Sequence, residues 1–183
     1  QENVRWILLI IWLEHKSKWG TNLNKKERMK SARFVAVDIL EAIENEGAYS
    51  NILLNNKINN QQVRSEDIAL LTELVYGTLQ KKITLDYFIN QLVKKPDKLS
   101  SWVRQLLRVS IYQLTELDDI PPHAVLNEAV EIAKIKGNRG ISGLVNGVLR
   151  NFTRKGAPEI EKIKDPWERL SVTYNLPVWL VKL

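Results

Sequence analysis

Apolar residues recur at three- and four-residue spacing in one segment after another, and this pattern most constrains the fold. It is clear in "SARFVAVDILEAIENEG" (residues 31–47) and again in the stretch that follows Ser101. No segment shows the convincing period-two alternation that a half-buried strand requires. Gly47, Pro96 and the pair Pro121 and Pro122 interrupt the helical pattern. The sequence therefore predicts an all-α bundle.

Residues that favour helix ends divide this pattern into segments. Ser50 and Asp165 are expected as N-caps, and Ser65 before two acidic residues is expected to start another helix. Glu168 stands at the capping-box position after Asp165, and Gly137 closes a helix. The side chains expected to face inward include Ile39, Leu40, Leu71, Val75, Leu106, Leu107, Ile111, Val125, Ile132, Leu144, Val145, Val148, Leu149 and Phe152.

The stretch "GISGLVNGVLRNF" (residues 140–152) carries a glycine inside its apolar stripe. Glycine in a helix interior costs about 1 kcal/mol relative to alanine. Gly147 therefore suggests that another backbone lies close to this helix, with sequence drift as the alternative. Asn146 and Arg150, four residues apart, are expected to lie together at the edge of the stripe.

Catalytic motifs are missing from the chain. Its 183 residues contain no cysteine, which excludes disulfides, thiolate metal sites and a cysteine nucleophile within it. The phosphate-binding and nucleophile-elbow glycine motifs are also missing. Only two histidines occur, and His123, at a helix start after two prolines, is assigned to packing or capping rather than catalysis. The chain is expected to be non-catalytic by itself, without catalytic, cofactor-binding or metal-binding residues.

The positive charge is modest overall and clustered locally. The formal net charge is +6, and half of that excess comes from residues 1–28. The basic clusters lie near helix ends, where a phosphate backbone could bind them. The alternative is that these cations interact with helix C-termini and keep the surface hydrated. Arg104 and Arg108, four apart, form one such basic pair on a helix.

Four segments, in order, resemble the NusB-like helical domain: "RFVAVDILEAIENEGAYSN", "LLTELVYGTLQKKITLDYFI", "LNEAVEIAKIKG" and "GLVNGVLRNF". "VYGTLQKKITLDYFI", "VNGVLRNF" and "DPWERLSVTYNLPVWLV" are also similar to the N-terminal region of the Sun/Fmu family, the 16S rRNA (cytosine-C5) methyltransferases B. The resemblance covers about residues 29–183. In "YNLPVW" the chain keeps only Pro177 and Trp179 of a turn often present in that family.

The resemblance implies a division of the chain. Residues 1–28, with the short apolar run "WILLIIWL", form an N-terminal extension of unknown role. Residues 29–156 form the NusB-like domain, and 157–183 form a helical linker towards a catalytic domain not present in this chain. That domain would contain the catalytic cysteines and bind S-adenosylmethionine. The implied partners are 16S rRNA and this C-terminal methyltransferase domain, in the cytoplasm and without a membrane.

The implied function is an RNA-binding N-terminal domain that helps to position rRNA for the methyltransferase. One alternative is a free NusB-type antitermination factor acting through RNA and protein partners, and another is a scaffold whose basic residues do not contact RNA. The resemblance also makes residues 140–152 part of a central packing helix, where Gly143 and Gly147 allow close approach and Asn146 is a hydrogen-bonding anchor. Clustering and resemblance together select these RNA contacts: Lys30, Arg33, Lys134, Lys136, Arg139, Arg150 and Arg154.

Overall fold

The computed structural model describes residues 24–47, 49–60 and 62–183, and this part of the chain is helical without a strand. The predicted all-α class is confirmed. The α-helices are α2 (Lys25–Arg28), α3 (Ala32–Glu46), α4 (Ser50–Asn59), α5 (Ile68–Gln80), α6 (Lys82–Leu92), α7 (Ser101–Glu116), α8 (Pro122–Lys136), α9 (Arg139–Lys155), α10 (Pro166–Tyr174) and α11 (Val178–Val181). Short 3-10 helices span Ser65–Asp67, Pro96–Lys98 and Ile160–Lys162. Most of the predicted 1–28 extension lies outside the described residues.

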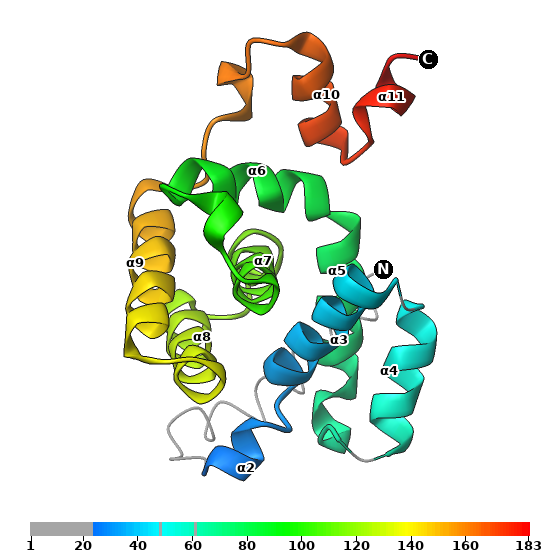
Figure 1. Ribbon diagram of the computed structural model, residues 1–183, viewed down its shortest axis with the longest axis vertical. Coiled ribbons are helices and arrows are strands. Elements are labelled where there is room, and N and C mark those ends of the chain that lie inside the picture. The colour runs from blue at the N-terminus through cyan, green and yellow to red at the C-terminus, as the bar shows by residue number, and fades with distance from the viewer. Residues whose placement is uncertain (1–23, 48, 61) are drawn as a thin grey trace.

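Helix α7 forms the centre of the bundle. Helices α3 and α5 pack on one side of it, α8 and α9 on the other, and α6 runs across above it in Figure 1. Because α7 is covered on several sides, its apolar residues Leu106, Leu107 and Ile111 are fully buried. Burial of side chains of this size stabilises the fold by about 1.5–3 kcal/mol each.

The helix ends explain why the segments stop where they do. Ser31 accepts a hydrogen bond from the Phe34 N–H, and Gly47 ends α3 in the left-handed conformation with φ 64°. Asp165 accepts from the Trp167 N–H, as its predicted role requires. Two predictions shift: Ser50 is the first residue inside α4 after Tyr49, and Ser65 begins a 3-10 turn that precedes α5. None of the described helices is long and apolar enough to cross a membrane.

The prediction for the glycines of α9 is wrong. A Cβ built on Gly143 or Gly147 would meet nothing within 4 Å, so neither residue allows a close approach of helices. Leu144, expected in the buried stripe, is 40% exposed for the same reason: this side of α9 faces solvent. The close approach is at Gly77 in α5, where a Cβ would lie 2.1 Å from the ring of Tyr112 on α7.

Charged side chains link α3, α6 and α7. The Arg108 guanidinium donates to both carboxylate oxygens of Asp86 at 2.8 and 2.7 Å and to Glu44 at 3.3 Å. Lys82 donates to Glu44 at 2.7 Å, and Arg104 pairs with Asp86. Burial alone would raise the pKa of Glu44, but the Lys82 hydrogen bond and the Arg108 charge hold that pKa below its usual value. The predicted basic pair of α7 is therefore engaged inside the bundle.

The C-terminal segment, from the 3-10 helix Ile160–Lys162 to α11, packs on the outer side of α6, at the top of Figure 1. The Tyr87 hydroxyl of α6 donates to the Glu159 carbonyl at 3.1 Å, and three further hydrogen bonds centre on Thr84. The Thr84 N–H donates to Asn175 Oδ1 at 3.0 Å, Asn175 Nδ2 donates to Thr84 Oγ1 at 2.7 Å, and the Thr84 hydroxyl donates to the Val172 carbonyl at 2.5 Å. We call this set the Thr84–Asn175 clasp. Residues 157–183, predicted to be a helical linker, are thus anchored to the bundle.

Candidate nucleic-acid interface

A surface groove lies between the first turn of α8 and the C-terminal half of α9. The two helices form a tight antiparallel hairpin whose turn contains Gly137 and Asn138, so the start of α8 lies beside the end of α9 (Figure 1). Gly147, without a side chain, leaves the groove open at its position. The residues that line the groove are Pro122, His123, Leu126, Gly147, Arg150, Asn151, Thr153 and Arg154.

Two predicted RNA contacts, Arg150 and Arg154, line this groove together. Both are exposed and lie one turn apart on α9. Arg150 Nε donates to Asn146 Oδ1 at 3.1 Å, and Arg154 Nη2 donates to Asn151 Oδ1 at 3.4 Å. Within residues 24–47, 49–60 and 62–183, no carboxylate lies within 4.0 Å of either guanidinium. Neutral amides therefore orient these cations without cancelling their charge.

Asn146 takes part in this arrangement. The prediction that it lies beside Arg150 at the edge of the α9 stripe is confirmed by their hydrogen bond. Asn146 accepts this bond from a residue of its own helix, α9, and Arg150 lines the groove. The asparagine thus positions a basic side chain at the groove.

His123 also lines the groove, although the sequence predicts a packing or capping role for it. It was expected to pack or cap at the helix start, but the N-cap is Pro121, no side chain caps the helix, and His123 is exposed at the groove. Its imidazole and the α8 N-terminus, where the helix dipole favours anions, face the same groove as Arg150 and Arg154. The groove therefore combines three features that suit a phosphate group.

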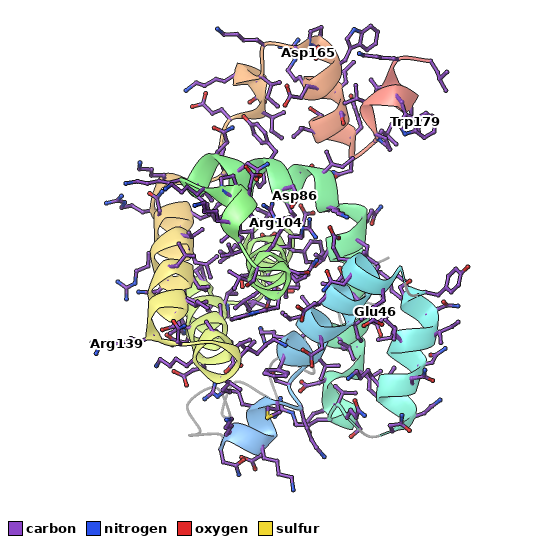
Figure 2. The ribbon with its side chains drawn as sticks, in the orientation of Figure 1. Glu46, Asp86, Arg104, Arg139, Asp165 and Trp179 are labelled. Carbon is purple, nitrogen blue, oxygen red and sulfur yellow. The ribbon has the colours of Figure 1, made fainter. Side chains whose placement is uncertain are left out.

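Three further predicted contacts are exposed but do not line the groove. Arg139 begins α9, eleven residues before Arg150, which separates them by about 16 Å along the helix axis. It projects at the far end of α9 in Figure 2. Lys134, near the same hairpin turn, pairs with Glu131 at 2.7 Å across an exposed contact. Lys30 is exposed between α2 and α3.

The remaining two predicted contacts are committed to internal interactions. Arg33 is 7% exposed, and its Nε donates to Gln113 at 2.6 Å. Burial lowers the pKa of this guanidinium, while Glu128 and Asp67 act in the opposite direction. Lys136 pairs with Asp38 at 2.5 Å and lies 5.2 Å from the ring centre of Phe34. A role for either in phosphate binding stays a prediction, and we leave both out of the interface.

The backbone arrangement defines the class of domain. The structure superimposes on NusB in the crystal structure of the antitermination factors NusB and NusE in complex with dsRNA with a TM-score of 0.62, at 22% identity. The match covers 70% of this chain and 97% of that chain. The protein is therefore an all-α domain with the NusB fold. A sequence model of the NusB family matches residues 30–154, and the chain belongs to this family.

Curated relatives extend the comparison. The chain is 49% identical over 152 residues to the probable ribosomal RNA small subunit methyltransferase B of Bacillus subtilis, covering 83% of this chain and 34% of the relative. It is 34% identical over 161 residues to the probable methyltransferase of the same description from Synechocystis, covering 85% of this chain and 35% of that relative. The chain thus spans about a third of the length of the curated relatives it matches.

Proposed function

We propose that this chain is the RNA-binding N-terminal domain of a 16S rRNA cytosine-C5 methyltransferase. The observation that carries this proposal is the length of the similarity. The 49% identity to the Bacillus subtilis relative runs over 152 residues, which is longer than the 30–154 span matched by the NusB family. The similarity to the methyltransferases thus extends beyond the part of the chain that resembles NusB.

The groove supplies the physical basis for RNA binding. Two guanidiniums one helical turn apart offer forked donors that match phosphate oxygens, and guanidiniums keep their charge at neutral pH. His123 lines the same groove and carries the first backbone N–H of α8, because Pro121 and Pro122 have none. Contacts of this kind fix the position of a nucleic acid without reading its sequence. The exposed cations Lys30 and Arg139 lie outside the groove and would add only a longer-range attraction for RNA, whereas Lys134 is paired with Glu131.

The chain's own part in the reaction is to hold rRNA. Methyl transfer from S-adenosylmethionine would be carried out by the remainder of the protein, which would also supply the cysteines expected from the family resemblance. This chain contains no cysteine. The division of labour separates binding from chemistry, so the two can be tested separately. We place this protein with its 16S rRNA substrate in the cytoplasm.

Binding of the chain to 16S rRNA segments across a salt series tests the interface. The variant Arg150→Glu/Arg154→Glu reverses the charge of the groove. Lys57→Glu/Lys182→Glu is the matched control, because it makes the same change in net charge at α4 and after α11. Overall charge effects will alter both variants alike, whereas a localised interface will be lost only in the first.

We expect affinity to fall steeply with salt for the parent chain, with a shallower slope for the groove variant. Each phosphate contact contributes about one unit to the slope of log affinity against log salt, so the slope should fall by about two. Equal losses in the two variants would show that binding depends on net charge alone. Flat, weak binding by the parent chain would refute RNA binding by this domain and favour a scaffold.

A free antitermination-type factor is the second candidate, favoured by the 97% coverage of the NusB chain. Reading the gene beyond codon 183 separates the two. A downstream domain with paired cysteines and an S-adenosylmethionine fold supports the methyltransferase, and a stop codon supports the free factor. Where the downstream domain exists, bisulfite analysis of 16S rRNA from a deletion strain should show loss of one 5-methylcytosine.

A further inference from the structure

Exposed apolar side chains gather at one end of the described structure. Thirteen large hydrophobic residues are exposed in its described part, and eight of them lie in residues 167–183. The other five are dispersed over α2, α4, α5 and α9 and their flanks, as is normal for single exposed residues. The eight residues are Trp167, Leu170, Tyr174, Leu176, Val178, Trp179, Leu180 and Leu183. We call this set the C-terminal platform.

Helix α10 is amphipathic with its apolar stripe left open. Trp167, Leu170 and Tyr174 follow the spacing of one helical face, and Tyr174 is 66% exposed. The residues that α10 buries are Ser171, whose hydroxyl bonds the turn into α11, and Val172, whose carbonyl accepts from Thr84 of α6. Helix α11 packs against α10 and adds Trp179, which is 67% exposed and projects outward in Figure 2. The platform is therefore contributed by both helices.

Hydrogen bonds within the domain itself hold the platform in one position. The Thr84–Asn175 clasp holds α10 to the first turn of α6, and Asn175 adopts the left-handed conformation with φ 56° that ends α10. The Ser171 hydroxyl donates to the Leu176 carbonyl at 2.5 Å, which fastens the turn into α11. A surface ordered in advance loses less conformational entropy when it binds. These contacts hold a docking face in one conformation.

We propose that the platform is the docking face for the polypeptide that follows Leu183, so that the NusB-like domain and the catalytic domain form one rigid unit. This inference rests on the proposed function. The methyltransferase relatives have about two thirds of their length outside the matched part, and the matched part is N-terminal in them. The platform lies in residues 167–183, which follow the part of the chain matched by the NusB family.

The chemistry of the platform favours a protein surface over RNA. Tryptophan and tyrosine, the aromatic residues of the platform, are enriched in the energetic centres of protein interfaces. Four of its members are leucines and one is a valine, which offer no stacking surface for bases. The arginines of the groove on α8 and α9 lie in another part of the bundle. RNA binding and domain docking therefore use separate surfaces.

Cleavage of the full-length protein tests the docking. A protease site inserted after Leu183 is cut, and size-exclusion chromatography with light scattering then follows whether the two pieces remain together. The platform variant is Tyr174→Ser/Trp179→Ser. The matched control is Tyr49→Ser/Ile52→Ser, which removes two exposed apolar side chains from the start of α4. Thermal unfolding of the 183-residue chain carrying each pair checks that both variants fold.

We expect the pieces of the parent protein and of the control to elute together, and the platform variant to separate with affinity reduced by roughly thirtyfold or more. Separation of the parent pieces, or their retention in the platform variant, would overturn the proposal. A concentration-dependent doubling of mass that the variant abolishes would assign the platform to a second copy of the chain. Loss of RNA affinity in the variant without separation would assign it to RNA. Failure of the salt-series test leaves this result intact, so the two proposals fail independently.

Discussion

Two arginine pairs look alike in the sequence and have opposite roles in the structure. Arg104 and Arg108 lie one turn apart on α7, and Arg150 and Arg154 lie one turn apart on α9. The side chain of Arg108 is 4% exposed and pairs with Asp86 and Glu44, whereas Arg150 and Arg154 are exposed and bonded to asparagines.

The difference comes from the neighbouring helices, not from the arginines. Helices α6 and α3 present carboxylates to α7, and their charges compensate for the burial of Arg108. The α9 pair faces the groove, where its hydrogen-bonding neighbours are amides. A basic cluster therefore indicates a nucleic-acid interface only where the fold leaves its charge uncompensated.

The largest contrast is expected from removing one arginine of each pair. Arg108→Ala leaves Asp86 and Glu44 without their shared cation, and should lower the free energy of unfolding by about 3 kcal/mol. Arg154→Ala removes an exposed side chain and should change it by less than about 0.5 kcal/mol. Urea denaturation of both variants measures the contrast. Equal losses would show that the α9 pair is also structural.

Replacing Gly77 or Gly147 by alanine compares the covered surroundings of α7 with the solvent-exposed face of α9. In Gly77→Ala the new Cβ meets the Tyr112 ring, which also donates a hydrogen bond to Glu73, so the free energy of unfolding should fall by about 1–3 kcal/mol. Gly147→Ala meets open space and should raise it by about 0.5–1 kcal/mol through helix propensity. Thermal unfolding compares the two. A destabilised Gly147→Ala would mean that the α9 face is covered.

Glu44 should make the stability of the bundle depend on pH. The folded-state pKa of Glu44 lies below its usual value of 4.5, so its contribution is present above that value and is lost as the pH falls through the folded pKa. Glu44→Gln should therefore be less stable than the parent at neutral pH, and the two should converge below about pH 4.

Denaturation at a series of pH values measures this convergence. Glu161→Gln, which removes an exposed carboxylate within the C-terminal segment, serves as the control for loss of one charge. A stability difference between Glu44→Gln and the parent that is constant from neutral to acidic pH would contradict the role given to Glu44.

The smallest effect is expected from the amides that orient the α9 arginines. Asn146→Ala removes the acceptor of the Arg150 Nε hydrogen bond and leaves the charge in place. RNA affinity should fall only about two- to threefold, with stability unchanged within about 0.5 kcal/mol. Fluorescence anisotropy with a labelled 16S rRNA segment would detect the change. A loss as large as that of Arg150→Ala would assign Asn146 a direct contact with RNA.

Periodicity and capping residues predicted most of the fold, because both are local. Gly47, Gly137 and Asp165 end or begin helices where the sequence placed these ends. The errors at Ser50 and Ser65 are shifts of a turn or less at helix starts. Periodicity predicts the angle of a side chain around its helix but not how much of that helix its neighbours cover. The sequence therefore predicts that Leu144 is buried, although it is exposed.

The candidate site could be predicted only in part, because it depends on how helices pair. His123 and Arg154 lie at similar distances in sequence from the turn between α8 and α9. If the two helices are antiparallel, this spacing predicts that the two residues lie close together. Nothing local distinguishes Arg33 and Lys136 from the exposed cations. Their acceptors, Gln113 and Asp38, are remote in sequence. Whether a basic side chain is paired with an acceptor therefore depends on the tertiary structure.

The Thr84–Asn175 clasp has a consequence for the order of folding. Its two partners are separated by 91 positions in the chain, and Asn175 leaves the ribosome after every helix from α3 to α9 has been synthesised. The bundle can therefore pack first, since its contacts lie within residues already available, and the clasp closes last. Closure of the clasp then marks the completion of the bundle, and it sets the final position of the platform.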